Sequence, residues 1–276
     1  MKVGLVQLTS GDDPALNLLA TVAAIREAAD RGAAFVLTPE VTNCVSASRA
    51  HQTGVLQHEA HDITLEGLRA AAATLGVWLS IGSLALKTDD PDGRFANRSF
   101  MINPKGDIVA RYDKIHMFDV DVSPTETYRE SAGYRAGDRA VLADTPFGKV
   151  GLSICYDLRF AYLYRALAQA GAAILVVPSA FSPVTGAAHW QALLKARAIE
   201  TGCFVLAAAQ TGQHPAVSGK SRQTYGHSMA ISPWGEVLAD AGVQAGVEII
   251  DIDLKDVSHA RRRIAALTHD RPFEGP

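Results

Sequence analysis

The sequence contains one pattern of segments twice, and this internal repeat limits the possible folds more than any other feature. Residues 2–5 (KVGL) recur as residues 149–152 (KVGL), and each copy opens an apolar run that is typical of a buried strand. Residues 32–39 (GAAFVLTP) recur in the same way as residues 171–178 (GAAILVVP). In both copies a glycine ends a helical stretch and an apolar run rich in β-forming residues follows, which predicts a helix-to-strand transition.

The remaining segments follow in the same order in both halves. They are amphipathic helices at 64–75 and 188–201, buried strands at 76–82 and 202–207, and hairpin turns at 103–106 and 232–235. The turns read NPKG and SPWG. Asn or Ser first, Pro second and Gly fourth favour a type I turn. Each half is therefore predicted to run β-α-β-α-β-β.

The strands are continuous apolar runs, so both faces of each predicted sheet must be buried. Helices can cover one face of each sheet, and the two remaining faces bury best against each other. This predicts an α/β fold, a four-layer α-β-β-α sandwich with an internal pseudo-twofold repeat. We expect residues 1–252 to form a single domain and residues 253–276, which are polar and Arg-rich, to form a C-terminal extension or tail. Residues 120–147 are the longest irregular stretch, and such loops are often functional.

Composition argues against several classes of partner. The net charge of the 276 residues is -3 and the pI is near 6.3, which favours neither nucleic acid nor an anionic membrane. No apolar run reaches the ~20 residues that a membrane-spanning helix needs. The three cysteines are scattered, which is typical of reduced thiols, so we expect a cytoplasmic protein. Neither a GxGxxG nor a GxxxxGK[ST] motif is present, so no nucleotide cofactor is expected.

Two side chains lie where predicted strands end, which is the edge where open parallel sheets bind ligands. Glu40 ends the strand at 35–38, and Cys155 ends the strand at 149–154. The segment after Cys155 reads as a tight turn and a helix, whose first N–H groups can bind an oxyanion and favour thiolate over thiol. A lone Cys is nevertheless most often a buried core residue.

The other candidates carry weaker signals. Cys203 lies within an apolar strand and is expected in the core, whereas Cys44 follows Glu40 in a loop. Lys114 opens the long irregular stretch, and Glu130 is a loop carboxylate within it; either residue is usually solvated surface. The segment 151–155 (GLSIC) resembles the GxSxG motif of serine hydrolases but lacks the last Gly.

A histidine cluster at 51, 58 and 61 suggests a metal site only superficially. The segment 58–61 (HEAH) is one residue short of HExxH, so its two imidazoles do not share a helical face. We expect a solvated loop and no metal.

Taken together, three motifs resemble those of the nitrilase, or carbon–nitrogen hydrolase, superfamily. They are TPE at 38–40, YDKIH at 112–116 and ICYDLRF at 154–160, in the superfamily's order and spread over the chain. The resemblance implies the α-β-β-α fold, hydrolysis of a linear amide, catalytic Glu40, Lys114 and Cys155, and no cofactor. It also implies that Glu130 is the superfamily's second glutamate, although Ala136 in the following turn stands where Pro is commoner.

Further segments are most similar to the branch that hydrolyses deaminated glutathione to 2-oxoglutarate and cysteinylglycine. These are PSAF at 178–181, TGAAHW at 185–190, ARAIET at 196–201, AAAQ at 207–210 and YGHSM at 225–229. The ω-amidase branch, which acts on α-ketoglutaramate and other small carboxylated amides, is the alternative. Relatives imply a homodimer or a larger homo-oligomer.

The resemblance also implies roles for the site residues. Glu40 would deprotonate Cys155, while Lys114 and the Tyr156 N–H would hold the oxyanion, and Glu130 would support Lys114 or the substrate. Arg159, Phe181 and Thr185 are expected to bind the substrate, Arg159 through a carboxylate. Two alternatives stay open: an acyl transferase that uses an amine in place of water, and a non-catalytic scaffold on the same fold.

Overall fold

The computed structural model describes residues 1–123, 126–217 and 219–275, and two six-stranded sheets form its centre. The first sheet has the spatial order β16 (Gly246–Asp251), β1 (Lys2–Gln7), β2 (Phe35–Leu37), β3 (Trp78–Leu86), β4 (Ala96–Ile102) and β5 (Ile108–Asp113). The second has the order β8 (Leu142–Thr145), β9 (Gly148–Leu152), β10 (Ala172–Val176), β11 (Phe204–Ala207), β14 (Met229–Ile231) and β15 (Val237–Asp240).

Strand directions repeat between the sheets. The outer pairs β16–β1 and β8–β9 are antiparallel. The next two pairs in each sheet are parallel, and the last two are antiparallel. The two halves of the chain therefore build the same sheet twice, which confirms the repeat predicted from the sequence.

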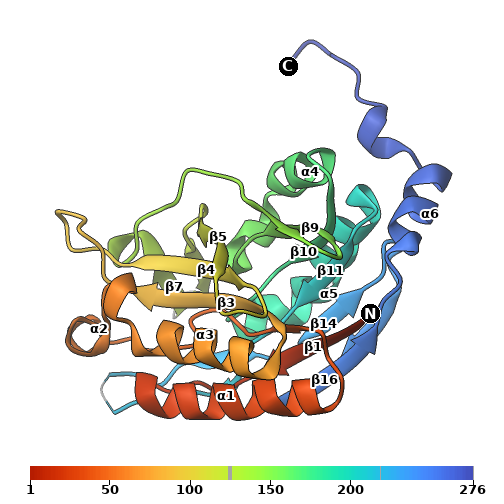
Figure 1. The fold of residues 1–276 in the computed structure, drawn as a ribbon. Coiled ribbons are helices and arrows are strands. Elements are labelled where there is room, and N and C mark those ends of the chain that lie inside the picture. The colour runs from red at the N-terminus through yellow and green to blue at the C-terminus, as the bar shows by residue number, and fades with distance from the viewer. Residues whose placement is uncertain (124–125, 218, 276) are drawn as a thin grey trace.

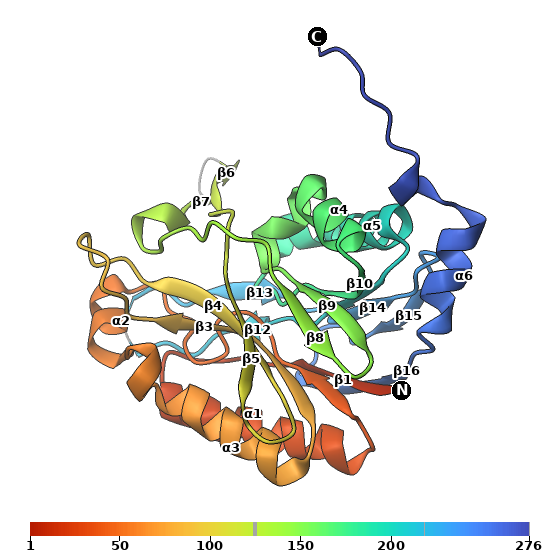
Figure 2. The ribbon, with the colours of Figure 1, turned by 45° about the horizontal axis from the view of Figure 1, so that its top comes forward.

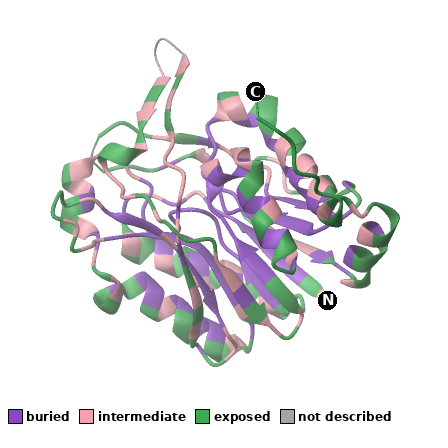
Figure 3. Ribbon diagram, turned by 90° about the horizontal axis from the view of Figure 1, so that it is seen from above, coloured by how far each residue is buried: buried purple, intermediate pink, exposed green. Residues whose placement is uncertain are grey.

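Helices cover the outer face of each sheet. Helices α1 (Pro14–Asp30) and α3 (Ile63–Leu75) lie against the first sheet, and α4 (Ala161–Gln169) and α5 (Pro183–Thr201) lie against the second (Figures 1 and 2). Within β2, Phe35 and Leu37 pack into the core between the sheets, while Val36 packs toward the helices. Both faces of the central strands are thus buried, as Figure 3 shows by colour, and the predicted α-β-β-α sandwich is confirmed.

Residues of the types that usually begin helices, end helices and close turns do so in the structure. The Asp13 carboxylate accepts hydrogen bonds from the first N–H groups of α1. Gly32 and Gly171, which follow helices α1 and α4, have φ of +90° and +102°. The N–H groups of Gly106 and Gly235 donate to the carbonyl oxygens of Asn103 and Ser232, both at 2.9 Å, and close the two expected turns.

Three insertions depart from the shared pattern, and the sequence predicts none of them as regular structure. They are α2 (Arg49–Val55) with the short helix η1 (Glu59–His61), the hairpin β6 (Asp119–Ser123)–β7 (Glu126–Arg129), and the hairpin β12 (Thr211–Gln213)–β13 (Gln223–Tyr225). The second insertion lies in the stretch expected to be irregular. Helix α2 and the β6–β7 hairpin lie at the same end of the sandwich (Figure 2).

The C-terminal segment contains helix α6 (Lys255–Arg263) and a short helix at Ala266–Thr268. Val257 and Ala260 of α6 are buried against the core, and Arg261 donates to the carbonyl oxygens of Thr201 and Ala172. The helix therefore packs on the second sheet, whereas residues 271–275 extend away from it (Figure 1). A domain boundary at residue 252 stays a prediction. No helix in the described part of the chain is both long and apolar enough to cross a membrane.

Gly82 of β3 lies where the two halves touch. A Cβ atom at this position would be 2.0 Å from the carbonyl oxygen of Thr38, 2.4 Å from that of Pro39 and 2.5 Å from Cβ of Pro178. Pro178 follows β10 in the other half of the chain. Only a residue without a side chain permits this approach.

We predict that Gly82→Ala lowers the free energy of unfolding by at least the about 1–3 kcal/mol typical of an overpacked core, because two of the obstructing atoms belong to backbone. Gly54→Ala is the matched control, since its Cβ would meet no atom within 4 Å and Gly54 lies in helix α2. This control should be neutral or slightly stabilising. Urea unfolding followed by circular dichroism measures both, and equal midpoints for the two variants would contradict the prediction.

Candidate active site

Glu40 lies three residues beyond the end of β2, and both oxygens of its buried carboxylate accept hydrogen bonds. One oxygen accepts from Nζ of Lys114 and Nδ2 of Asn97, both at 2.9 Å, and the other accepts from the Ala180 N–H at 2.9 Å. The next residue, Val41, has φ of 45°, which is unfavourable for a β-branched residue. A strained turn at Val41 thus follows Glu40 and helps to fix the position of its carboxylate.

Lys114 follows β5 and is only 2% exposed. Its ammonium group donates to Glu40 at 2.9 Å and to both carboxylate oxygens of Glu130, at 2.9 and 2.8 Å. Burial alone would lower the pKa of Lys114, but the charges of Glu130 and Glu40 outweigh it and hold the pKa well above its ordinary value. Lys114 is therefore a permanent cation between two carboxylates.

The same charges act on Glu40. Burial alone would raise the pKa of its carboxyl group. The charge and hydrogen bond of Lys114, followed by the charge of Arg222, outweigh this effect and hold the pKa below its usual range. Glu40 is ionised at neutral pH and is able to accept a proton.

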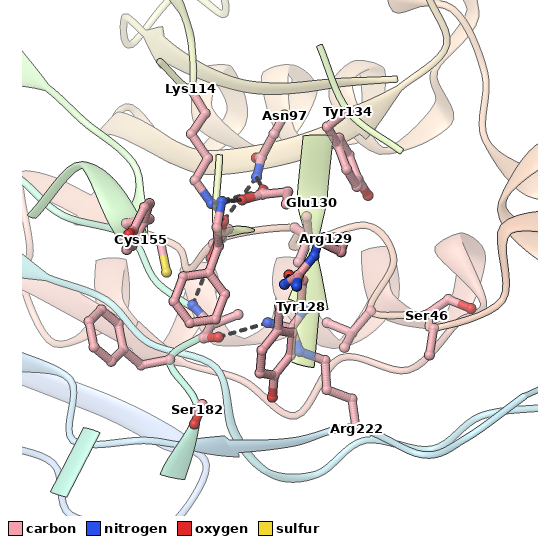
Figure 4. Close-up of a pocket in the computed structure, with 18 of the residues that line it drawn as sticks. Ser46, Asn97, Lys114, Tyr128, Arg129, Glu130, Tyr134, Cys155, Ser182 and Arg222 are labelled. Atoms are coloured by element: carbon pink, nitrogen blue, oxygen red, sulfur yellow. Dashed lines mark hydrogen bonds and ion pairs between the residues drawn. The ribbon is translucent and has the colours of Figure 1, made fainter. Parts of the chain in front are cut away.

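Cys155 begins the short helix η3 (Cys155–Arg159) and has φ of 49°, in the left-handed region. Its N–H donates to the carbonyl oxygen of Pro178 at 2.9 Å, which fixes this strained residue against the neighbouring strand end. Its side chain lies beside Glu40 and Lys114 and faces the cavity (Figure 4). Strain at the end of a strand is common at functional sites.

The protonation state of Cys155 differs from the expectation. Burial and the neighbouring negative charge of Glu40 raise the pKa of the thiol, and Lys114 opposes them only in part. The helix that was expected to favour thiolate is a single short turn, so its dipole is small. Cys155 therefore rests as a thiol and requires a base before it can attack.

Asp157 ties two of the motifs together. Its buried carboxylate accepts from the Tyr112 hydroxyl at 2.7 Å and from the Ile154 N–H at 2.8 Å. It also accepts from the His116 backbone N–H at 3.0 Å and lies 2.7 Å from Nδ1 of the same residue. One carboxylate thus fixes the segment that carries Lys114 relative to the segment that carries Cys155.

A cavity of about 290 Å³ opens over these groups. Its size is near the lower end of small-molecule sites, which suits a metabolite rather than a polymer. Aromatic side chains form much of its wall: Phe118, Tyr128, Tyr134, Tyr156 and Phe181. The three insertions contribute lining residues such as Gln52, Arg129 and Arg222 (Figure 4). The parts of the chain that break the repeat therefore shape the cavity.

Most residues singled out in the sequence meet here. Glu40, Lys114, Cys155, Glu130, Tyr156, Phe181 and Thr185 all line the cavity. Arg159 is not among the lining residues. Its guanidinium carbon lies 5.9 Å from the centre of the Tyr156 ring and 5.8 Å from that of the Phe181 ring, and Nη2 lies 3.2 Å from Nδ1 of His189. Its role as a carboxylate anchor stays a prediction.

Sequence reasoning missed Asn97, Tyr128 and Arg222. Asn97 lies within β4, where nothing in the local pattern distinguishes its amide from that of a structural residue. Tyr128 and Arg222 lie in the two inserted hairpins, whose strands of three to five residues are too short and too polar to indicate a buried sheet.

The other residues considered in the sequence, Ser153, Cys203 and His51, have structural roles. Ser153 is buried and bonds to the Tyr164 hydroxyl at 2.7 Å and the Val176 carbonyl at 2.8 Å. Cys203 is buried in the core, and Nε2 of His51 lies 2.8 Å from the Asp12 carbonyl oxygen. Within the described residues, no group of three or more His, Cys, Asp or Glu side chains is arranged to hold a metal ion.

Comparison with known proteins supplies independent information. The sequence model of the carbon–nitrogen hydrolase family matches residues 2–262. The deaminated glutathione amidase of Yersinia enterocolitica is 37% identical over 270 residues, which cover 98% of this chain and 92% of that protein. The human protein of the same name is 39% identical over 273 residues, covering 98% of this chain and 82% of that protein.

Solved structures agree with this. The NitFhit protein of Caenorhabditis elegans matches with a TM-score of 0.90 and 36% identity, over 98% of this chain and 65% of NitFhit. Nit3 of Saccharomyces cerevisiae, a member of branch 10 of the nitrilase superfamily, matches with a TM-score of 0.86 and 27% identity, over 99% of this chain and 97% of Nit3. An amidase of Nesterenkonia sp. AN1, in which acrylamide has added to the active-site cysteine, matches with a TM-score of 0.77 and 25% identity, over 96% of this chain and 98% of that amidase.

The buried charge cluster leads to a prediction about stability. Lys114→Met leaves Glu40 and Glu130 without their cation, and breaking a buried ion pair in this way costs about 3–5 kcal/mol at neutral pH. Without Lys114, burial would dominate and raise the pKa of Glu40 above its value in the unfolded chain. The loss of stability in the variant should therefore shrink as the pH falls, because Glu40 then folds in its neutral form.

In the wild type the pKa of Glu40 shifts in the opposite direction on folding. The folded-state pKa of Glu40 lies below its unfolded value, so the stability that it contributes is present above the unfolded pKa and is lost as the pH falls through the folded pKa. Denaturant unfolding of both proteins at pH 7 and pH 5 measures the difference. The double variant Lys114→Met/Glu40→Gln, in which residue 40 cannot ionise, should show a smaller change with pH. A difference between wild type and Lys114→Met that is the same at both pH values would contradict this account.

Proposed function

This chain belongs to the carbon–nitrogen hydrolase family and is an amidase, and we propose that it hydrolyses deaminated glutathione through a thioester on Cys155. The observation that carries the proposal is the meeting of Cys155, Glu40 and Lys114 at one wall of a cavity of small-molecule size. The relatives named deaminated glutathione amidase, which match nearly the whole chain, support the choice of substrate.

In the first step Glu40 accepts the proton of the Cys155 thiol, and the sulfur attacks the carbonyl carbon of the amide. The raised pKa of the thiol makes this proton transfer necessary, and the ionised state of Glu40 makes it possible. The carbonyl oxygen becomes an oxyanion. Lys114 is the fixed positive charge beside it, and the Tyr156 N–H, which has no acceptor among the described residues, is a second donor.

In the second step the carbon–nitrogen bond breaks, and Glu40 delivers its proton to the departing amine. The acyl group remains on Cys155 as a thioester. Glu40 then takes a proton from water, the hydroxide attacks the thioester, and the proton passes to the departing sulfur. For deaminated glutathione the products are 2-oxoglutarate and cysteinylglycine, and the enzyme returns to its starting state.

The supporting residues have defined places in this scheme. Glu130 binds Lys114 through both carboxylate oxygens and accepts from the Phe118 N–H at 2.7 Å, so we assign it the role of holding the ammonium group in position. Phe181 and Thr185 line the cavity and are assigned to substrate contact. No step requires a metal or an organic cofactor. A cytoplasmic location and a homodimer or larger homo-oligomer, both expected at the sequence level, remain predictions.

We predict that Cys155→Ala abolishes turnover, because no other group replaces the sulfur as nucleophile, while the melting temperature changes little. Cys203→Ala is the matched control: this thiol lies in the core, and its loss should leave kcat intact. Glu40→Gln should also lose orders of magnitude in kcat. Lys114→Met should lose at least about 10²–10³, the usual cost of one oxyanion donor, because it also removes the charge that keeps Glu40 ionised. More than a trace of activity in Cys155→Ala would exclude the thioester route. A loss confined to KM in the other two variants would demote those residues to substrate binding.

The substrate assignment has its own test. Deaminated glutathione should give a higher kcat/KM than α-ketoglutaramate, because the leaving group of the larger substrate adds contacts that the small ω-amide lacks. If α-ketoglutaramate is turned over equally fast or faster, the chain is an ω-amidase instead.

Product analysis with and without added amine separates hydrolysis from acyl transfer, since a transferase would yield a new amide in place of 2-oxoglutarate.

A further inference from the structure

Arg222 occupies a distinct position in the cavity wall. It directly precedes β13, and its carbonyl oxygen accepts from the His214 N–H at 2.8 Å, so the inserted hairpin fixes its backbone. Its side chain enters the cavity from the side opposite Lys114 (Figure 4). One Nη donates to the carbonyl oxygen of Ala180 at 2.9 Å, and the other guanidinium N–H groups have no acceptor within the described residues.

The other cations of the cavity are already neutralised. Lys114 lies between Glu40 and Glu130. Nη2 of Arg129 donates to both carboxylate oxygens of Asp121, at 2.8 and 3.0 Å. Among the described lining residues, Arg222 is the cation without a carboxylate partner. A guanidinium held in a partly buried wall with unused donors is suited to a bidentate carboxylate or phosphate.

Arg222 is also linked to Glu40, the proposed base, through the backbone of one residue. Ala180 joins the two: its N–H donates to Glu40 and its carbonyl oxygen accepts from Arg222. A single residue and two hydrogen bonds therefore separate the reacting carboxylate from the guanidinium. The charge of Arg222 is felt at Glu40, whose pKa it helps to lower against the effect of burial. A small-molecule substrate can therefore reach from the reacting groups to the guanidinium of Arg222.

We propose that Arg222 binds a carboxylate of the substrate and makes this amidase selective for anionic amides. The inference rests on the proposed function and assigns the anchor to Arg222, in place of the Arg159 expected from the sequence. Deaminated glutathione carries two carboxylates, one on the 2-oxo acid that is transferred to Cys155 and one on the glycine of the leaving group. The shared chemistry is a carboxylate, and the experiment distinguishes its two sources.

The experiment compares three substrates: deaminated glutathione, its glycine carboxamide, and 4-oxopentanoyl-cysteinylglycine, in which a methyl group replaces the 2-oxo acid carboxylate. Arg222→Gln should lower kcat/KM for deaminated glutathione about tenfold to hundredfold, the loss expected for hydrogen bonds to a charged group. The wild type should lose a similar factor on the analogue that lacks the bound carboxylate. On that analogue Arg222→Gln should have little further effect, because both changes remove the same interaction. Which analogue behaves in this way identifies the carboxylate.

Matched variants make the result specific. Lys220→Gln removes a positive charge from the same loop at an exposed position outside the cavity lining, and its kcat/KM should match that of the wild type. Arg222→Lys should recover only part of the activity, because it keeps the charge but loses the planar fork. Equal losses for Arg222→Gln on all three substrates would overturn the proposal. So would a carboxylate-dependent loss in Arg159→Gln that is absent from Arg222→Gln.

Failure of the substrate assignment is separable from failure of this inference. If the wild type does not hydrolyse deaminated glutathione, the same variants are compared on succinamate and butanamide, which differ by a carboxylate in place of a methyl group. A wild-type preference for succinamate that disappears in Arg222→Gln supports the anchor on its own. A preference that persists in Arg222→Gln refutes it.

Discussion

The site depends on one interaction, in which the buried ammonium group of Lys114 pairs with the buried carboxylate of Glu40 and the partly buried carboxylate of Glu130. Lys114 holds Glu40 ionised, and Glu130 holds Lys114 in place. Burial by itself would disfavour the charged forms of Lys114 and Glu40, and the charge of each offsets this cost for the other. The cluster joins β2, β5 and the inserted β6–β7 hairpin, so the same contacts that prepare a base also fix the cavity wall. Cys155 can then remain a protonated, unreactive thiol until a substrate is present.

The sequence predicts the repeated architecture well, because the repeat imposes the same apolar periodicity on both halves. Glu40 and Cys155 were predictable as site residues for a related reason: each interrupts an apolar run where a strand must end. Lys114 was identified through its motif rather than through any physical signal, since a lysine after a hairpin strand is ordinarily solvated. Its burial depends on Glu130, which arrives from an insertion that periodicity does not reveal.

The residues that escaped prediction belong to the insertions or act through tertiary contacts. Arg222 and Tyr128 lie on short hairpins whose positions depend on packing between distant segments. The protonation state of Cys155 escaped for another reason. A helix start suggests a stabilised thiolate, but the amount of helix and the depth of burial decide between the two forms, and neither can be read from the local sequence. The local sequence thus predicts where a reactive group lies, whereas its protonation state depends on the whole fold.

The pairing of β1 with β16 has a consequence for how the chain is made. Lys2 pairs with Asp251 and Gln7 with Gly246, so one edge of the first sheet is closed by a strand that is synthesised long after β1. Until then β1 presents an unpaired, largely apolar edge of the kind that joins other chains. Contacts so distant in sequence also form slowly. A nascent chain is therefore open to aggregation through this edge until β16 has been synthesised.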